Sequence, residues 1–500
     1  MKIIFLVNQT EEEWEMEKKQ AFNPYLPSYE YVPDGEPHVV DGRVYIYGSH
    51  DLFNGLNFCL GDYVCWSAPV DDFGNWRYEG CIYKREQDPA APKIRLTNGL
   101  AAPDMVQGDD GRYYLYYFMG GTKMISVAVC DKPAGKYEFY GYVQYADKVP
   151  IGKKNEPFQF DPGIFRDDDG RLYLYTGFAL QGNPILLDGS KPTEHGPMCF
   201  EIDPKDMLTV KSGPEYIGIA GEKESIGTPY EGHAFLEASS MRKFGDTYYF
   251  IYSSLNSHEL CYATSDNPTC GFEYGGILIS NGDIGLPGVT DVGHAKNDTG
   301  NTHGSLIEIN GNYYIFYHRH TNRKQSSRQA CAEKIRFENG KFYQAEVTSC
   351  GLNNGPLRGH GEYPAYIACN LYGKDGTKFL SMLKRRKGGC PYITQDGGDR
   401  EEGPDQYVAN VCDGAVVGYK YFDLADTKEI RINIKGNADG VVTIKDGEGS
   451  DAALLSEIRV SGAGGGKGFV GKLDNVKNGQ ALFFGFKGKG AFKFVSFDLK

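Results

Sequence analysis

The sequence predicts an all-β protein, a five-bladed β-propeller followed by a smaller β-sandwich domain. A short phrase recurs five times in the first 320 residues: an ionisable residue lies 7 to 9 positions before a glycine turn, and an aromatic-rich strand follows that turn. The composition agrees, because 36 Tyr, 28 Phe and 65 Gly suit short aromatic strands between glycine turns. At 500 residues the chain also exceeds one ordinary hydrophobic core, so two domains are expected.

The recurring ionisable residues predict a shared site at the axis of the propeller. Five similar β-units in a ring each direct one end of their inner strand to a common axis. An inner strand of this length spans roughly 20 Å, so its ionisable residue lies at one end. A series of β-sandwiches would explain the strands but not the constant offset. The five residues are Asp34, Asp104, Asp161, Glu237 and His303, and their glycines are Gly42, Gly111, Gly170, Gly245 and Gly311.

The pattern changes after Tyr343, which places the domain boundary. Residues 348–364 are rich in Gly, Asn and Pro, and alternating strands with regular turn signals follow from about residue 376. We therefore expect an N-terminal tail over 1–21, the propeller over 22–345, a closing segment and linker over 346–375, and the sandwich over 376–500.

Charge and cysteine content limit the partners and the compartment. The chain has 53 basic and 66 acidic residues and a net charge of −13, so it repels phosphate backbones, and nucleic acid is not an expected partner. No stretch has membrane-spanning length. The 12 cysteines include no C-x-x-C pair, and the apolar run at residues 3–7 is too short for a signal-peptide core. A cytoplasmic protein with reduced thiols is expected.

Convergent carboxylates point to hydrolysis of a sugar linkage, which needs an acid and a base on either side of the bond. Several carboxylates in one pit shift one another's pKa values, so one can stay protonated while another is ionised. Taken singly, Asp104 could be only a turn cap and His303 only a core histidine. Ser49, His50 and Asp51 have the residue types of a catalytic triad, but consecutive residues on a strand cannot form its geometry.

Several motifs together resemble glycoside hydrolase family 43, whose members are five-bladed inverting enzymes, and the resemblance covers about residues 22–345. The motifs are residues 34–51 in the first blade, 160–165 in the third, 237–243 in the fourth, 302–305 in the fifth, and the segment 327–331.

The resemblance implies a role for each matched residue. Asp34 would be the general base, Asp161 would orient the acid and tune its pKa, and Glu237 would be the general acid. Arg328 would bind substrate, and His303 would lie on the axis near a bound metal, often calcium; no organic cofactor is implied. The remaining members of the expected substrate site are Asp104, Glu36 and His38.

Two assignments have rivals. The family usually has Asp-Pro where this chain has Asp34-Gly35, and Glu36 could align with the base if a gap is allowed. Glu231 competes with Glu237 for the role of acid, but it lies outside the shared offset.

The predicted activity is removal of terminal α-L-arabinofuranosyl or β-D-xylosyl residues, with inversion, from oligosaccharides of plant polysaccharides. A galactan- or galactofuranoside-active hydrolase, a related retaining enzyme and a non-catalytic sugar-binding propeller remain alternatives. The C-terminal region resembles a family 6-type carbohydrate-binding sandwich, although its closing strand, 491–497, lacks the Asp that commonly holds calcium. Sugar binding and a packing role both stay open for it, and the sequence specifies neither the sugar nor the oligomeric state.

Overall fold

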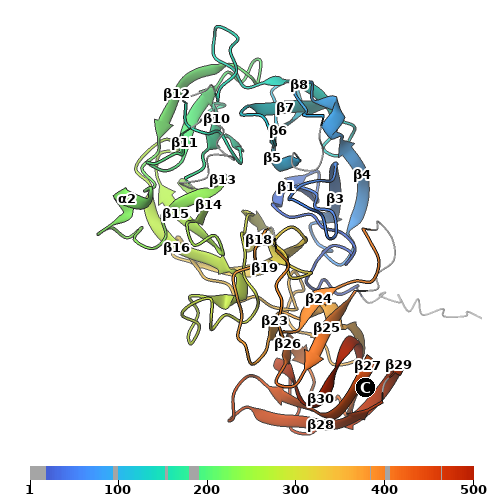
Figure 1. The fold of residues 1–500 in the computed structure, drawn as a ribbon. Helices are drawn as coiled ribbons and strands as arrows, with labels where there is room; N and C mark the ends of the chain where they lie inside the picture. The colour runs from blue at the N-terminus through green and yellow to red at the C-terminus, as the bar shows by residue number, and fades with distance from the viewer. Residues whose placement is uncertain are drawn as a thin grey trace, which may run out of the picture.

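A computed structural model describes residues 18–93, 99–152, 156–179, 191–382, 384–399, 406–462 and 464–500. Five four-stranded antiparallel sheets form a ring, and one further sheet of ten strands lies beside it (Figure 1). The predicted all-β class and five-bladed propeller are confirmed. Of the predicted N-terminal tail, residues 1–17 lie outside the described part of the chain.

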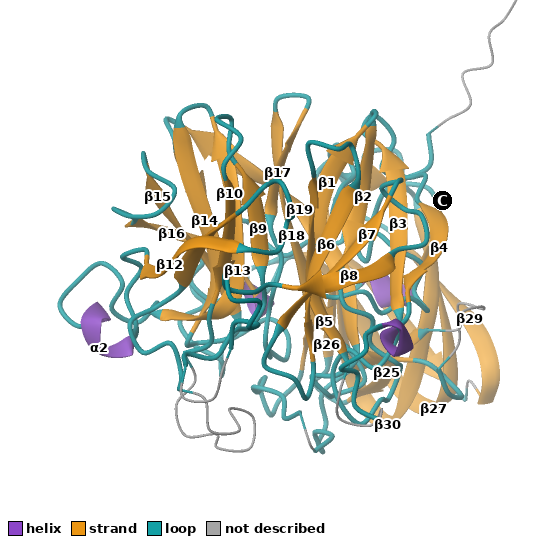
Figure 2. Cartoon of the chain, turned by 90° about the horizontal axis from the view of Figure 1, so that it is seen from above, coloured by secondary structure: helices purple, strands orange, loops and turns teal. Residues whose placement is uncertain are grey.

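Each blade consists of four consecutive strands, with the first strand innermost in the ring (Figure 1). Figure 2 shows the ring from the side, with the strands of neighbouring blades next to one another. The strands are β1 (Glu36–Val40), β2 (Arg43–Tyr47), β3 (Tyr63–Pro69) and β4 (Arg77–Tyr83); β5 (Leu100–Gln107), β6 (Tyr113–Met119), β7 (Ile125–Cys130) and β8 (Glu138–Tyr142); β9 (Gly163–Arg166), β10 (Leu172–Thr176), β11 (Met198–Ile202) and β12 (Val210–Tyr216); β13 (Phe235–Phe244), β14 (Thr247–Ser254), β15 (Glu259–Ser265) and β16 (Glu273–Ser280); and β17 (Leu306–Ile309), β18 (Asn312–His320), β19 (Arg328–Glu338) and β20 (Lys341–Tyr343).

The repeated phrase builds the inner hairpin of every blade. The five glycines of the phrase have φ between 62° and 84°, which is the left-handed conformation that glycine adopts without strain. The aromatic strand after each turn is the second strand of its blade, and both of its faces pack against neighbouring blades. In β6, for example, all seven residues are buried. Strands buried on both faces read as continuous apolar runs, as these do.

A close approach of two glycines joins the first and last blades. Gly35 and Gly304 form a parallel β-bridge directly beside the predicted site residues Asp34 and His303. A Cβ atom on Gly304 would lie 1.9 Å from the carbonyl oxygen of Phe316, so no larger residue fits there. The ring therefore closes at the site itself.

The strands of the C-terminal domain are connected into one curled sheet of ten strands. Its longest strand, β30 (Gln480–Leu499), pairs with β22, β25, β26 and β27, and β27 (Glu429–Asp446) also pairs with β28 and β29. A continuous apolar core of Leu, Ile, Val and Phe side chains lies within it. The other strands are β21 (Leu357–Arg358), β22 (Gly361–Pro364), β23 (Asn370–Tyr372), β24 (Tyr392–Thr394), β25 (Tyr407–Cys412), β26 (Val416–Asp423), β28 (Ala453–Ser461) and β29 (Gly464–Lys472).

The propeller and the C-terminal domain are joined by buried polar contacts. Arg319 on β18 donates hydrogen bonds to the carbonyl oxygens of Tyr366 and Ala368, at 2.8 and 3.1 Å. Lys420 on β26 pairs with Asp283 at 3.1 Å and with Glu346 at 2.8 Å. Helices are few and short: η1 (Arg85–Gln87), α2 (Glu222–Ser225), η3 (Asn281–Asp283) and η4 (Ala365–Ile367). Among the described residues, none of the helices is long and apolar enough to cross a bilayer.

Candidate active site

Four of the predicted residues meet at one end of the inner strands. Asp34, Asp161 and His303 lie just before β1, β9 and β17, and Glu237 is the third residue of β13. The Nδ1 atom of His303 lies 3.4 Å from Oδ2 of Asp161. The negative charges of Asp161 and Asp34 both act on Glu237. The structure therefore brings these four side chains from four different blades into one group.

Local backbone irregularities direct these side chains to the axis. Asp34 and Asp161 have φ of 59° and 45°, and Ala238, next to Glu237, has φ of 67°. The pairing of β13 with β14 also shifts register on both sides of Glu237, as in a β-bulge. A left-handed conformation costs a residue with a side chain about 1–2 kcal/mol, and such strain is concentrated at functional sites. Bulges likewise re-aim a side chain next to active sites.

Glu237 has the environment of a proton donor. Burial raises the pKa of its carboxyl group, the negative charges of Asp161 and Asp34 raise it further, and the result is a pKa of about 8. The positive charges of His303 and Arg328 oppose this shift only in part. At neutral pH the side chain is therefore protonated, as a general acid must be.

Asp34 forms a buried ion pair with Arg328. The Nη1 atom of Arg328 donates to Oδ1 of Asp34 at 2.8 Å. His318, a neighbour that the sequence did not predict, has its Nε2 atom 2.9 Å from the carbonyl oxygen of Asn301, so Nε2 carries the proton. Its Nδ1 atom then accepts the backbone N–H of Asp34, at 3.5 Å. Burial lowers the pKa of His318 well below its ordinary value, so its imidazole is neutral.

Arg328 is itself fixed by Asp51. The Nε atom of Arg328 donates to Oδ2 of Asp51 at 2.8 Å, and Nη2 donates to Oδ1 at 3.0 Å. The ring of Phe58 lies 4.6 Å from the guanidinium carbon. A two-pronged contact of this kind fixes orientation as well as charge. Asp51 is the last of the three consecutive residues, Ser49, His50 and Asp51, that cannot form a triad. In the structure it holds the arginine that contacts Asp34.

Asp161 connects the strand of Glu237 to His303. Its Oδ2 atom accepts the N–H of Ala238, the residue after Glu237, at 3.2 Å. On its other side His303 lies between Asp161 and Glu36, with 3.8 Å from Nε2 to Oε1 of Glu36. Burial lowers the pKa of His303, but the nearby carboxylates of Asp161 and Glu36 raise it well above its ordinary value. His303 is therefore an imidazolium between two carboxylates.

Glu36, His38 and Asp104 form a second group along β1 and β5. Oε2 of Glu36 accepts from Ser240 at 3.0 Å and pairs with Nη2 of Arg242 at 2.5 Å. Burial opposes ionisation of Glu36, but Arg242 and His303 hold its pKa below the ordinary value. Nε2 of His38 lies 2.7 Å from Oδ1 of Asp104.

The second group has the donor atoms for a metal ion. One atom each of Glu36, His38 and Asp104 lies within 4.8 Å of the other two. Oε1 of Glu36 is buried and has no hydrogen-bond partner in the structure, which is where an ion or a water would be expected. Two carboxylate oxygens and one imidazole nitrogen fit a divalent cation, but Ca²⁺ takes six to eight oxygen ligands, so water would complete its shell. Both nitrogens of His303, the predicted metal residue, face carboxylates instead.

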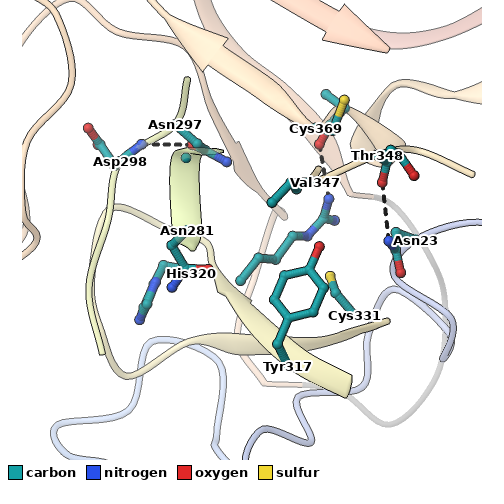
Figure 3. Close-up of a pocket in the computed structure, with 13 residues that line it drawn as sticks. Asn23, Asn281, Asn297, Asp298, Tyr317, His320, Cys331, Val347, Thr348 and Cys369 are labelled. Carbon is teal, nitrogen blue, oxygen red and sulfur yellow. Dashed lines mark hydrogen bonds between the residues drawn. The ribbon is translucent and has the colours of Figure 1, made fainter. Parts of the chain in front are cut away.

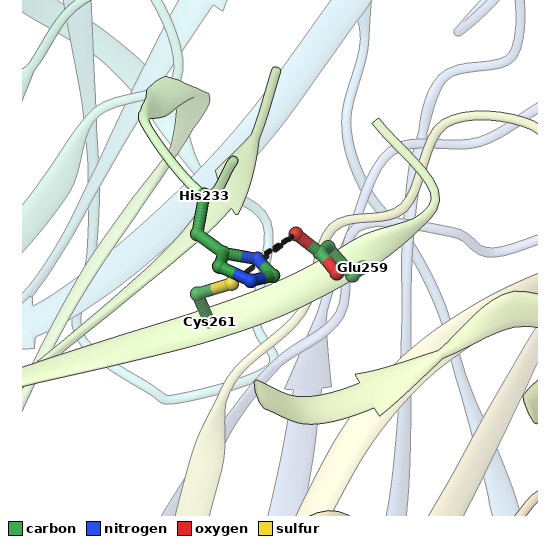
Figure 4. A group of neighbouring side chains, drawn as sticks. All are labelled: His233, Glu259 and Cys261. Atoms are coloured by element: carbon green, nitrogen blue, oxygen red, sulfur yellow. Dashed lines mark hydrogen bonds and ion pairs between the residues drawn. The ribbon is translucent and has the colours of Figure 1, made fainter. Parts of the chain in front are cut away.

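A second cluster of metal-ligand types, in the fourth blade, is a satisfied hydrogen-bond network. It consists of His233, Glu259 and Cys261 (Figure 4). Oε1 of Glu259 already accepts from His233 at 2.7 Å, from Ser254 at 2.6 Å and from Asn256 at 3.0 Å. This oxygen needs no further partner, and we assign the cluster a structural role.

A small cavity lies between the fifth blade and the C-terminal domain (Figure 3). Its walls include Asn23, Tyr317, Arg319 and Cys369, and its volume of about 20 Å³ admits one water molecule. None of the predicted catalytic residues lines it. The cavity belongs to the contact between the domains and not to the catalytic group.

Comparisons with known proteins agree with this geometry. The family model described as glycosyl hydrolases family 43 matches residues 23–342. Over 485 residues the chain is 48% identical to a xylosidase/arabinosidase of Thermoclostridium stercorarium, covering 96% of this chain and 99% of that protein. It is 24% identical over 505 residues to an arabinoxylan arabinofuranohydrolase of Bacillus subtilis strain 168, covering 92% of this chain and 88% of that protein.

A solved structure supports the fold of the ring. The GH43_1 enzyme of Xanthomonas citri aligns with a TM-score of 0.50 and 23% identity, over 65% of this chain and 94% of that chain. The family model spans more than half of the chain and includes Asp34, Asp161, Glu237 and His303. The chain belongs to glycoside hydrolase family 43, as the resemblance of its motifs predicted.

Proposed function

We propose that the protein removes terminal α-L-arabinofuranosyl or β-D-xylosyl residues from short oligosaccharides of plant polysaccharides, with inversion at the anomeric carbon. The observation that carries the proposal is the pair of unlike carboxyl groups, a Glu237 with a pKa of about 8 and an Asp34 ion-paired with Arg328. The name of the relative that is 48% identical, a xylosidase/arabinosidase, supports the choice of sugar.

In the proposed mechanism Glu237 donates its proton to the oxygen of the leaving sugar. Asp34 accepts a proton from a water molecule that attacks the anomeric carbon from the opposite face. Asp161 keeps Glu237 protonated through its charge and holds the neighbouring backbone. Arg328, fixed by Asp51, holds the carboxylate of Asp34 in one orientation. An inverting enzyme needs roughly 6.5–9.5 Å between its two carboxyl groups, so that the water fits between them.

The test is a panel of nitrophenyl glycosides followed by analysis of the product anomer. Release from arabinofuranoside or xyloside is expected, and proton NMR during the first turnovers should show the anomer of opposite configuration. Release only from galactofuranoside would change the sugar but not the mechanism. A product of retained configuration would assign Asp34 as a nucleophile, with carboxyl groups about 5–5.5 Å apart. No release from any glycoside would favour a sugar-binding propeller.

We further propose one divalent cation, with calcium as the predicted ion, at Glu36, His38 and Asp104. The buried and unpartnered Oε1 atom of Glu36 supports this position. A cation there would offset the negative charge of two buried carboxylates at the axis. This position replaces His303 as the predicted ligand.

We also propose a reducing compartment, and therefore the cytoplasm, for the protein. All 12 cysteines are free thiols in the structure. Burial raises the pKa of several of them, including that of Cys331 to about 12, which keeps these thiols protonated and unreactive. Localisation of a tagged protein in its native cell would test this.

A further inference from the structure

Tyr31 connects the C-terminal domain to the catalytic group. Its side chain is buried, and its hydroxyl donates to Oε1 of Gln395 at 2.8 Å and accepts from Nε2 of Gln406 at 2.6 Å. Both glutamines belong to the C-terminal domain. The backbone carbonyl of the same tyrosine accepts the N–H of Asp51, at 2.9 Å. One residue thus contacts the C-terminal domain with its side chain and the holder of Arg328 with its backbone.

From Asp51 the contacts continue to the proposed base. Asp51 binds Arg328 through two hydrogen bonds, and Arg328 binds Asp34 at 2.8 Å. Tyr31, Asp51, Arg328 and Asp34 are all buried. Because solvent cannot substitute for a lost partner at any of these points, a shift at one end displaces the next group rather than being absorbed by water.

Two further contacts from the C-terminal domain involve residues close in sequence to Asp51 and Arg328. Oδ1 of Asp399 accepts the N–H of Phe53, two residues after Asp51, at 2.6 Å. Oε1 of Gln406 accepts from Nε2 of Gln329, the residue after Arg328, at 2.9 Å. The C-terminal domain therefore contacts both segments of the pair, the one that carries Asp51 and the one that carries Arg328.

The loop that precedes Arg328 is held in the same way. Asn322 donates its backbone N–H to the carbonyl oxygen of Ile393 at 2.8 Å, and its Oδ1 accepts from Thr394 at 3.1 Å. Arg386 forms an ion pair with Asp298 on the segment that leads to His303. Ile393 and Thr394 belong to β24, and Arg386 lies on the segment that precedes this strand.

We infer that Tyr31, Gln395 and Gln406 are positioning residues for catalysis, through which the C-terminal domain sets the geometry of Asp51, Arg328 and Asp34. The domain then contributes to turnover of any substrate, including one too small to reach it. This role differs from carbohydrate binding, which would matter only for long or insoluble substrates. The inference rests on the proposed function, because it takes Asp34 as the base.

The test uses Tyr31→Phe in the full chain, with a nitrophenyl glycoside that the wild-type protein cleaves. This variant keeps the ring and removes only the hydroxyl. A misplaced catalytic group costs about 10- to 100-fold, so kcat should fall by that factor while KM changes by less than about 2-fold. This split between kcat and KM distinguishes a displaced catalytic group from a loss of substrate binding.

Two comparisons separate positioning from a general loosening of the domain contact. Tyr421→Phe removes a similar hydroxyl, which donates to Glu346 at 2.7 Å. This contact does not involve the catalytic group, so the variant should keep wild-type kinetics. The double variant Tyr31→Phe with Gln395→Ala should lose less kcat than the product of the two single losses, because both substitutions remove the hydrogen bond that joins these two side chains.

A wild-type kcat in Tyr31→Phe would overturn the inference, and so would an equal loss of kcat in Tyr421→Phe. Neither result would touch the proposed function, which is tested on the wild-type protein alone, by the glycoside panel and the configuration of the product.

Discussion

The carboxylate of Asp161 contacts the imidazole of His303, with 3.4 Å between Oδ2 and Nδ1. The same oxygen accepts the backbone N–H that follows Glu237. A single carboxylate oxygen thus lies between the imidazolium of His303 and the strand that carries Glu237, the proposed acid. The protonation of Glu237 should therefore depend on Asp161, and a pH profile of activity can measure this dependence.

Replacing Asp161 with Asn should move the alkaline limb of activity to lower pH. Glu237 must be protonated to act, and its pKa of about 8 keeps it so through neutral pH. Burial is the largest cause of that raised value and the charge of Asp161 is the next, so removing the charge lets Glu237 ionise earlier. A kcat/KM profile from pH 5 to about 9 measures the shift. Asp169→Asn, at an exposed turn of the same blade, should leave the limb in place.

Glu237→Gln should reduce kcat by about 10²–10⁴-fold, since the amide cannot donate the proton that the leaving oxygen needs. Folding should be unchanged, as measured by circular dichroism and the melting temperature. Glu231→Gln is the matched control, because Glu231 is exposed and only caps the N–H of Gly227. Loss of activity in the Glu231 variant, with full activity in the Glu237 variant, would reverse the assignment of the acid.

Arg328→Lys should lower kcat/KM by about 100-fold or more although the charge is kept. Lysine cannot reproduce the two bonds to Asp51 and the third to Asp34 at once. The control on the same strand is Arg336→Lys, whose exposed guanidinium approaches Glu338 and lies over the ring of Tyr343. Steady-state kinetics on the preferred nitrophenyl glycoside compare kcat/KM of the two variants with that of the wild-type protein. An active Arg328→Lys enzyme would show that charge alone suffices.

Removal of divalent cations should lower both the melting temperature and the activity. A metal that binds only the folded state stabilises that state, by an amount that grows with the logarithm of the metal concentration divided by Kd. We therefore expect the melting temperature to fall by at least about 2 °C when the metal is removed. Adding calcium back should restore both properties, and Glu36→Gln should remove the response. A metal-free sample, verified by elemental analysis, that melts and turns over like the untreated protein would assign the space beside Glu36 to water.

Gly304→Ala should destabilise the propeller by about 1–3 kcal/mol or more, because the added methyl group meets a backbone carbonyl of β18. The free energy of unfolding in urea provides the measurement. Gly465→Ala places a methyl group in open space and should change little. Equal stability of the two variants would mean that the ring relaxes at its closing point.

The repeat predicted the site residues that recur, and the family resemblance added Arg328, which does not recur. Asp34, Asp161, Glu237 and His303 share one offset from a glycine turn, and the structure brings these four together at one end of their strands. Asp104 has the same offset but lies within β5 and contacts His38, so the offset alone does not decide what a side chain reaches.

Asp51 and His318 could not be predicted as partners of Arg328 and Asp34. Each contact joins residues more than 270 positions apart, and no local spacing records such a pair. The contacts of Tyr31 with the C-terminal domain are of the same kind. Long-range polar pairing is set by how blades and domains pack, which periodicity within one strand does not encode.

The pairing of β30 has a consequence for how the protein is made. This strand, at residues 480–499, lies between strands on both of its edges and contributes Phe484, Phe494 and Phe497 to the core. The nascent C-terminal domain therefore stays unfinished on the ribosome until those residues emerge. A premature stop before residue 480 would leave unpaired strand edges and an uncovered apolar core, and the expected fate of such a product is aggregation or degradation.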